Sequence, residues 1–306
     1  MSYGILLAFS VCANVCGAIV RKFITNRFRN SGSSRLFYNL ITSAVSAVLL
    51  LVMADSLQAS LFTVLLALVF GIVTALQAIF ILQALECGPL SYTTVIISLS
   101  MLIPTVSGAL FWGESIVPIQ IVGIVLMVLC FILSVDTSGE QKKATLKWLV
   151  FCAVAFVLTG AIGIMQKLHQ SSPHKAELDA FLIIAFAFSC VYSASSWGIL
   201  AIKNRSTEQP AESTEDAEGG KKPIFSWLPI LLMMLCGGCI AINNKLNLFL
   251  SGVMDSAIFF PVVNGVGLIL TSLAAFLLFR ERLTRRQWLG LATGIAAVLC
   301  LCNPFG

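Results

Sequence analysis

Amide and ionisable side chains inside apolar segments are the residues of this sequence that could do chemistry. The cluster Asn243-Asn244-Lys245 stands in a long apolar run, where Lys245 would lie roughly 7–8 Å from the centre of a membrane-spanning helix at 1.5 Å per residue. An ammonium beside amides can bind a carboxylate or phosphate; the alternative is a snorkelling lysine whose charged head reaches the interface. No acidic residue stands in the middle of an apolar run, so we expect an anionic or zwitterionic substrate at Lys245, with Asn243 or Asn244 adding hydrogen bonds.

Three further amides and two prolines are candidates on the same grounds. Asn14, Gln77 and Asn264 fall inside apolar runs, and each either binds substrate or hydrogen-bonds a neighbouring helix. Pro104 and Pro261 remove a backbone donor inside two other runs. Such breaks line a cavity or provide a hinge in many membrane proteins, the alternative being a plain kink.

Catalytic and metal-binding patterns are weak. His169 and His174 are the only histidines, and their spacing gives no fixed ligand geometry on a helix. Cys236-Gly-Gly-Cys239 has the spacing of a metal or redox motif, but no second pair stands nearby, and cysteine in lipid is a small apolar packing residue. We therefore expect no enzyme, no cofactor and no metal, with an intramembrane enzyme as a remote alternative.

The elements that must position these residues follow from composition. The chain has 306 residues, of which 58% are hydrophobic and 11% charged, with a mean hydropathy of +0.96. Soluble domains carry roughly 25% charged residues and cannot hide so much apolar surface. The sequence predicts an all-α integral membrane protein whose partners are the lipid bilayer and a small-molecule substrate. It excludes a soluble enzyme, a secreted disulfide scaffold and a nucleic-acid-binding module.

Apolar runs of about 20 residues, the length that crosses the hydrocarbon core as a helix, predict ten transmembrane helices. They are Tyr3–Ile24, Arg35–Met53, Gln58–Leu85, Pro89–Trp112, Val117–Val135, Thr145–Leu168, Leu178–Ile202, Phe225–Leu250, Asp255–Phe279 and Gln287–Cys302. The first run lacks a basic flank and a cleavage site, which predicts a mature helix and no cleaved signal peptide. The polar stretch 203–223 lacks apolar residues to bury, which predicts a disordered loop.

An internal repeat relates the two halves of the chain. A Glu-x-x-x-x-x-Gln-x-x-Gly pattern occurs before the last span of each half, at an offset of 167: Glu114, Gln120, Gly123 and Glu281, Gln287, Gly290. A weaker match relates the ends of the first and sixth runs, where Lys22 corresponds to Lys167. Residues 1–138 and 144–306 are thus predicted to be two five-helix repeats. Because five is odd, the second repeat enters the bilayer from the opposite side, as in many secondary transporters.

Ten helices in two halves, each with this motif before its last span, resemble the EamA-type drug/metabolite transporter superfamily. The resemblance implies a central cavity lined by the first, third and fourth helices of each half, and alternating access of a small metabolite. It also implies that the fifth and tenth helices pack together or form a homodimer, and Gly290-x-x-x-Gly294 suits such close approach. We expect a gradient-driven or facilitative transporter, the alternative being a proton-coupled exporter of cationic or neutral compounds.

Basic residues favour one orientation. Sixteen of the nineteen Lys and Arg residues fall on the loops after the first, third, fifth, seventh and ninth spans. The positive-inside rule places those loops in the cytoplasm and both termini outside. The EamA resemblance implies the opposite, with both termini inside. We expect the orientation set by the charges, in a multi-pass protein of a bacterial cytoplasmic (inner) membrane.

A cysteine placed between Lys203 and Pro223 tests this orientation. In intact cells that carry the protein without accessible native cysteines, the new thiol should resist a membrane-impermeant reagent, because the loop is cytoplasmic. Ready labelling there, with permeabilised cells as the positive control, would reverse the orientation.

Overall fold

The computed structural model describes residues 3–27, 32–87, 90–134, 145–206, 227–278 and 284–302. Its helices follow in chain order: α1 Tyr3–Arg27, α2 Gly32–Val52, α3 Leu61–Cys87, α4 Leu90–Leu99, α5 Leu102–Phe111, α6 Pro118–Leu133, α7 Leu146–Gln170, the short 3-10 helix η1 Lys175–Glu177, α8 Leu178–Ser206, α9 Trp227–Val253, α10 Ser256–Leu278 and α11 Arg285–Cys302. The described residues contain no strand, so the all-α prediction is confirmed. Helix α8 extends into the first residues of the stretch 203–223, and the rest of that stretch lies outside the described residues.

Six helical segments are long and apolar enough to cross a membrane: Tyr3–Arg21, Leu61–Ile81, Leu146–Gln170, Lys175–Ile199, Trp227–Val253 and Ser256–Leu278. Three shorter apolar segments accompany them, at Leu36–Val52, Val95–Phe111 and Pro118–Leu133. A helix satisfies its own backbone donors and acceptors, which is the condition for entering the hydrocarbon core. The protein therefore has the helices of an integral membrane protein.

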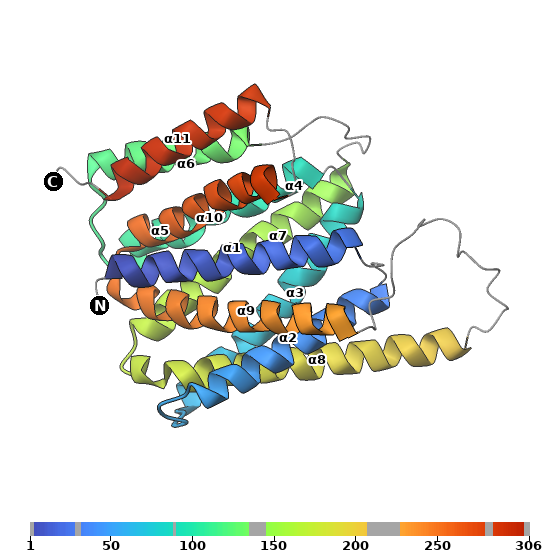
Figure 1. Ribbon diagram of the computed structural model, residues 1–306. Coiled ribbons are helices and arrows are strands. Elements are labelled where there is room, and N and C mark those ends of the chain that lie inside the picture. Colours follow the sequence, from blue (N-terminus) through green and yellow to red (C-terminus); the bar gives the residue numbers. More distant parts are fainter. Residues whose placement is uncertain are drawn as a thin grey trace.

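The helices lie side by side, and the chain reverses at nearly every turn (Figure 1). One end of the bundle holds Tyr3 and the turns at 53–60, 112–117, 171–177 and 254–255; we call it the Tyr3 end. The opposite end, which α1 reaches at Arg27, is the Arg27 end. Any residue can thus be placed by its distance along a helix from one of these two ends.

Two groups of three elements make up the interior. Helix α1 packs on α9 and α10, which we call the α1 group. Helix α7 packs on α3 and on the α4–α5 pair, which we call the α7 group. Helices α2 and α8 pack on each other and join the groups, α2 through α9 and α8 through α3. Helices α6 and α11 form an antiparallel pair at one side of the bundle, where they pack on α10 (Figure 1).

Glycines permit the closest of these contacts. A Cβ on Gly237 in α9 would lie 2.8 Å from the carbonyl oxygen of Thr42 in α2, and one on Gly71 in α3 would lie 3.4 Å from that of Ala185 in α8. Small residues at such points let helix backbones approach, which compensates for the weak hydrophobic drive between helices in lipid. The joins between α2, α8 and the two groups therefore depend on single glycines.

Helices α6 and α11 meet through the glycines of the repeat motif. A Cβ on Gly123 would lie 2.7 Å from Leu301 Cγ, and one on Gly290 would lie 3.0 Å from Ser134 Oγ. A Cβ on Gly294 would lie 2.7 Å from the sulfur of Cys130. The α6–α11 pair within one chain thus uses the glycines that the sequence singled out for close packing.

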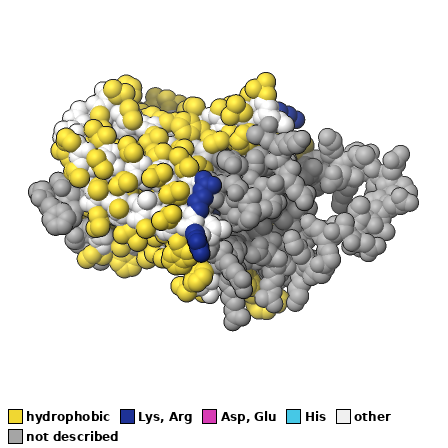
Figure 2. All heavy atoms as spheres, turned by 90° about the horizontal axis from the view of Figure 1, so that it is seen from above, with side chains coloured by type: hydrophobic (Ala, Val, Ile, Leu, Met, Phe, Trp, Pro, Cys, Tyr) yellow, Lys and Arg dark blue, Asp and Glu magenta, His cyan; other side chains and the backbone are white. Residues whose placement is uncertain are grey.

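The outer face of α6 and α11 is apolar. Figure 2 shows a hydrophobic surface over these helices, with Lys or Arg side chains at its edge. Its exposed residues include Ile121, Val125, Leu129, Leu289, Ile295 and Leu299. A soluble protein rarely leaves so large an apolar patch exposed, whereas lipid tails cover it without cost.

The two prolines act differently. Helices α4 and α5 are separate at Ser100–Met101, and the amide of Ile103 bonds the carbonyl of Ser100 at 3.1 Å. Pro104 has no N–H to reach that carbonyl, so the interruption lies one turn before it. Helix α10 continues through Pro261. The helix is therefore interrupted one turn before Pro104, whereas at Pro261 it continues without the hydrogen bond that proline cannot donate.

Adjacent glycines in α9 provide a matched test of this packing. Gly237→Ala places its methyl group against the backbone of α2, whereas a Cβ on Gly238 would come no nearer than 3.8 Å to Leu49. We expect Gly238→Ala to be neutral or stabilising by up to about 1 kcal/mol through helix propensity. Gly237→Ala should cost about 1–3 kcal/mol by overpacking. Thermal unfolding in detergent, followed by tryptophan fluorescence, measures both; equal melting temperatures would contradict the proposed contact.

Candidate functional site

A polar groove lies between α1 and α9, near the middle of both helices and toward the Arg27 end. Its polar residues are Asn14, Arg21 and Asn243. Small residues form the remaining wall, together with one isoleucine: Ala13, Gly17, Ala18, Cys239 and Ile240. Two amides and a guanidinium therefore share a concave surface inside segments that are otherwise apolar.

A hydrogen-bonded cluster closes the groove on the side of the Tyr3 end. The buried hydroxyl of Ser10 lies 3.0 Å from Asn243 Oδ1 and 2.5 Å from Asn247 Oδ1. Asn247 Nδ2 donates to Asn243 Oδ1 at 3.3 Å. The carbonyl side of the Asn243 amide is thus held by the protein, which orients its NH₂ group. Ser10 and Asn247 were not among the predicted binding residues, although the spacing of four from Asn243 to Asn247 places these two asparagines on one helix face.

Arg21 supplies the positive charge of the groove. Its Nε donates to the hydroxyl of Tyr38 in α2 at 3.3 Å. The same hydroxyl lies 2.9 Å from the sulfur of Cys236 in α9. These contacts hold the guanidinium beside the groove, where a planar fork of donors matches a carboxylate or phosphate.

Lys245 does not reach the groove. Its Nζ forms an ion pair with Asp179 in the first turn of α8 at 2.7 Å and donates to the carbonyl of Met53, just past α2, at 2.8 Å. The expectation that the protein offers Lys245 no acidic partner was therefore wrong. The long lysine stem carries the charge to a layer of helix ends, where an acidic residue of another helix is available.

Helical geometry separates the members of the cluster Asn243-Asn244-Lys245. Successive residues of an α-helix project about 100° apart, so positions 243 and 245 point to nearly opposite sides of α9. Asn243 accordingly faces α1, and Lys245 faces α2 and α8. Asn244 donates to the carbonyl of Ile240 in its own helix at 2.9 Å. One ligand group cannot contact Lys245 and Asn243 together, so the expected joint site is not formed.

Two of the other predicted amides, Gln77 and Asn264, hydrogen-bond protein groups, and Asn14 borders the groove. Gln77 in α3 donates to the hydroxyl of Thr159 in α7 at 3.1 Å, which joins two helices of the α7 group. Asn264 in α10 is exposed and donates to the carbonyl of Phe260 in its own helix at 2.8 Å. Asn14 is exposed into the groove, with its amide nitrogen 3.5 Å from where a Cβ of Gly267 would lie. Of the six predicted binding residues, the structure brings Asn14 and Asn243 together.

A buried ion pair holds the turn between α9 and α10. Lys167, in the last turn of α7, pairs with Glu114 at 2.5 Å, and their side chains are 8% and 10% exposed. Lys167 also donates to the carbonyl of Met254, and Glu114 accepts from the backbone N–H of Ser256 at 2.7 Å. The cation thus caps the end of α9, and the anion caps the start of α10, as their helix dipoles favour. We call this arrangement the Lys167–Glu114 clamp.

The remaining residues of the repeat motif have capping and packing roles. Gln120 Oε1 accepts from the N–H of Val117 at the start of α6, and Gln287 Oε1 accepts from that of Thr284 at the start of α11. Each glutamine therefore satisfies one of the free N–H groups of its helix start. Gly123 and Gly290 pack the two helices as described above. Glu281 lies outside the described residues.

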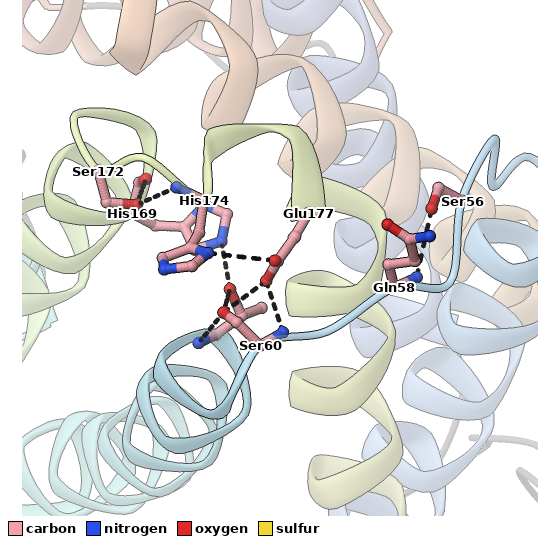
Figure 3. A network of polar contacts seen from close by, with 8 residues as sticks. Ser56, Gln58, Ser60, His169, Ser172, His174 and Glu177 are labelled. Atoms are coloured by element: carbon pink, nitrogen blue, oxygen red, sulfur yellow. Dashed lines mark hydrogen bonds and ion pairs between the residues drawn. The ribbon is translucent and has the colours of Figure 1, made fainter.

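The two histidines belong to a network at the Tyr3 end (Figure 3). Glu177 accepts from the backbone N–H and hydroxyl of Ser60 at 2.8 and 2.7 Å and lies 3.2 Å from His174. His169, fully buried, lies 3.4 Å from the hydroxyl of Thr63. The network fastens the start of α3 to the turn between α7 and α8. The described residues contain no group of three or more His, Cys, Asp and Glu side chains that could hold a metal.

Comparison with known proteins yields a likeness of fold. No protein-family model matches the chain, and no curated protein matches it. Among solved structures, one crystal structure of a protein superposes with a TM-score of 0.71 over 97% of this chain and 98% of the other, at 13% identity. At that identity the likeness concerns the fold alone, and it extends over nearly the whole length of both chains.

The ion pair of Lys245 gives a test of its structural role. Lys245→Met leaves Asp179, 11% exposed, without its cation, so the melting temperature should fall by an amount equivalent to about 1–3 kcal/mol. Lys245→Met combined with Asp179→Asn should recover much of the loss, because no unpaired charge remains. Thermal unfolding in detergent measures both. A double variant as unstable as the sum of the two single variants would contradict the pairing.

Proposed function

We propose that the protein is a secondary transporter of a small anionic or zwitterionic metabolite, of the EamA type that its sequence resembles. Two inverted five-helix repeats alternate access to a polar site between them. The α4–α5 pair counts as one interrupted span, so the proposal has ten spans, with the shorter α6 and α11 as the fifth and tenth. The observation that supports it most is the equivalence of helix contacts between the two halves.

This equivalence appears when each helix of the first half is exchanged with its counterpart in the second. The contact of α1 with α9 becomes that of α7 with α3, and the contact of α2 with α9 becomes that of α8 with α3. The contact of α1 with α10 becomes that of α7 with α4 and α5. The contacts α2–α8, α5–α10 and α6–α11 each exchange into themselves. A pseudo-two-fold axis in the membrane plane produces such a pattern and is the basis of alternating access in inverted-repeat transporters.

Individual residues support the same relation. The contact of Gly123 with Leu301 corresponds to the contact of Gly290 with Ser134. Gly290 lies 167 residues after Gly123, and Ser134 lies 167 residues before Leu301. Both corresponding interfaces also contain an interhelical amide–hydroxyl contact, Gln77 with Thr159 between α3 and α7 and Asn243 with Ser10 between α9 and α1. The sequence repeat therefore coincides with a repeat of contacts, which local helix packing alone does not require.

The groove of Asn14, Arg21 and Asn243 is the proposed part of the substrate site. A guanidinium with neighbouring amides binds a carboxylate or phosphate and offers further hydrogen bonds to a small polar molecule. Lys245 is not part of the proposed site, because it holds Asp179. The proposed orientation keeps the Arg27 end in the cytoplasm, since the basic loops follow from that end, and a homodimer through α6 and α11 stays a prediction.

The proposal is tested by a thermal-shift screen of the purified protein against amino acids, organic acids, sugar phosphates and cationic drugs. A ligand that binds the folded state raises the melting temperature. We expect carboxylate- or phosphate-bearing compounds to do so, and the same compounds to enter proteoliposomes that contain the protein. Stabilisation by cationic compounds alone would favour a cation exporter, and the absence of any transported compound would contradict the transporter.

The groove is tested on the compound that the screen identifies. Arg21→Gln should weaken its binding roughly tenfold to hundredfold, the loss of a charged hydrogen bond of about 1.5–3 kcal/mol. Arg286→Gln is the matched control, because Arg286 lies at the Arg27 end of α11 and donates to the carbonyl of Ile132, away from the groove. Equal binding by both variants in titration calorimetry would remove Arg21 from the site.

A further inference from the structure

Several contacts between the α1 group and the α7 group lie at the Tyr3 end. Helix α7 meets α9 where Lys167 bonds Met254 and where a Cβ on Gly252 would lie 2.7 Å from Gln170. Helix α5 meets α10 where Glu114 holds Ser256, beside Gly108. The groove of Asn14 and Arg21, in contrast, lies toward the other end of α1. Under the proposed transport function, this arrangement corresponds to a state closed at the Tyr3 end.

The Lys167–Glu114 clamp occupies a special place among these contacts. Lys167 lies in α7 and Glu114 in the turn that follows α5, and both hold backbone atoms of the α1 group at the turn between α9 and α10. The α1 group cannot move away from the α7 group at this end unless Met254 and Ser256 leave the clamp. Buried ion pairs with few alternative partners favour one discrete arrangement over a continuous range.

The sequence repeats the clamp but not the neighbouring ion pair. Lys22 corresponds to Lys167 and Glu281 to Glu114, although Lys22's side chain and Glu281 lie outside what the structure describes. Gln77 in α3 and Asn243 in α9 occupy corresponding interfaces. The first-half position that corresponds to Lys245 therefore lies at Ala78 or Ile79, and neither of these residues is basic. A device needed only to fasten one end would not require a second copy, whereas a device that acts in alternation would.

We propose that the Lys167–Glu114 clamp is the gate of the Tyr3 end, and that its release of the α9–α10 turn opens that end while the groove closes at the other. The inference rests on the proposed transport function and names the residues of one gate. Lys167 and Glu114 are positioning residues in this proposal, because they act on helix ends and not on the substrate.

The test uses two single-cysteine reporters in a background without other reactive cysteines. One reporter is Ala257→Cys, at a position that follows Ser256 in α10 and is 1% exposed; the other is Ala18→Cys, at a position that lines the groove. A hydrophilic thiol reagent is applied to the protein in nanodiscs, where both ends are accessible. In the otherwise unchanged protein we expect a slow reaction at position 257 and a fast one at position 18.

Lys167→Met removes the cation and keeps an apolar stem of similar length. If it moves an equilibrium of about 1:99 by about a hundredfold, the two states become about equally populated. The rate at position 257 then rises about fiftyfold, and the rate at position 18 falls to about half, the reciprocal change that alternation requires. Glu114→Gln, which keeps the acceptor for Ser256 and lacks the charge for Lys167, should act in the same direction and provides a second variant if Lys167→Met does not fold.

Lys245→Met is the matched control, because it breaks an ion pair at the same end whose contacts join α9 to α8 and to Met53 and not to the α7 group. It should leave both reporter rates unchanged despite its lower melting temperature. Faster reaction at both reporters in Lys167→Met would indicate simple loosening, and unchanged rates in a folded variant would indicate a static cap; either result overturns the gate. Failure of the wild-type protein to move any compound into proteoliposomes, with reciprocal rates preserved, would instead overturn the transport function and leave the gate in place.

Discussion

The cost of an unpaired polar group in a low-dielectric interior governs how this bundle is joined. Helix ends expose free carbonyl and N–H groups, and in a membrane protein those near the hydrocarbon layer need partners from the chain. Lys167 and Glu114 provide such partners for the end of α9 and the start of α10, and they neutralise each other in doing so. The same principle places Lys245 between Asp179 and the carbonyl of Met53.

This requirement divides the polar residues into two sets. Most of them hold the fold: Gln77 binds Thr159, Glu177 binds Ser60, and the motif glutamines cap α6 and α11. A smaller set borders the groove between α1 and α9, where the amides and a guanidinium face a concave surface. Ser10 and Asn247 support the groove by fixing the carbonyl side of Asn243.

The correspondence of several helix contacts between the two halves gives these sets a functional meaning under the transport proposal. If the halves are inverted copies, each end of the bundle has a counterpart at the other end, and a contact found at one end of the repeat has a place at the opposite end. The glycine contacts of α6 on α11 and of α11 on α6 correspond to each other and are both formed, which suits a pair of helices that stays together. The Lys167–Glu114 clamp is formed at the end away from the groove. This position suits a contact that is formed at one end of the bundle while the other end is open.

Composition and run lengths determined that the chain is a helical membrane protein, because the bilayer admits few structures and demands long apolar helices. The position of most helices, the interruption before Pro104 and the close packing of Gly290 and Gly294 also follow from local patterns, since proline and glycine act on the backbone where they stand. Even the separation of Asn243 from Lys245 follows from the sequence once helical geometry is applied.

Only the tertiary structure decided which polar groups pair. Asp179 and Glu114 are far from Lys245 and Lys167 along the chain, and each pair forms because turns between helices bring their ends together at one end of the bundle. The groove likewise depends on the packing of α1 against α9, helices that belong to different halves of the chain. An ion pair between distant residues depends on distance and burial in three dimensions, and a one-dimensional pattern of polar and apolar residues carries neither quantity.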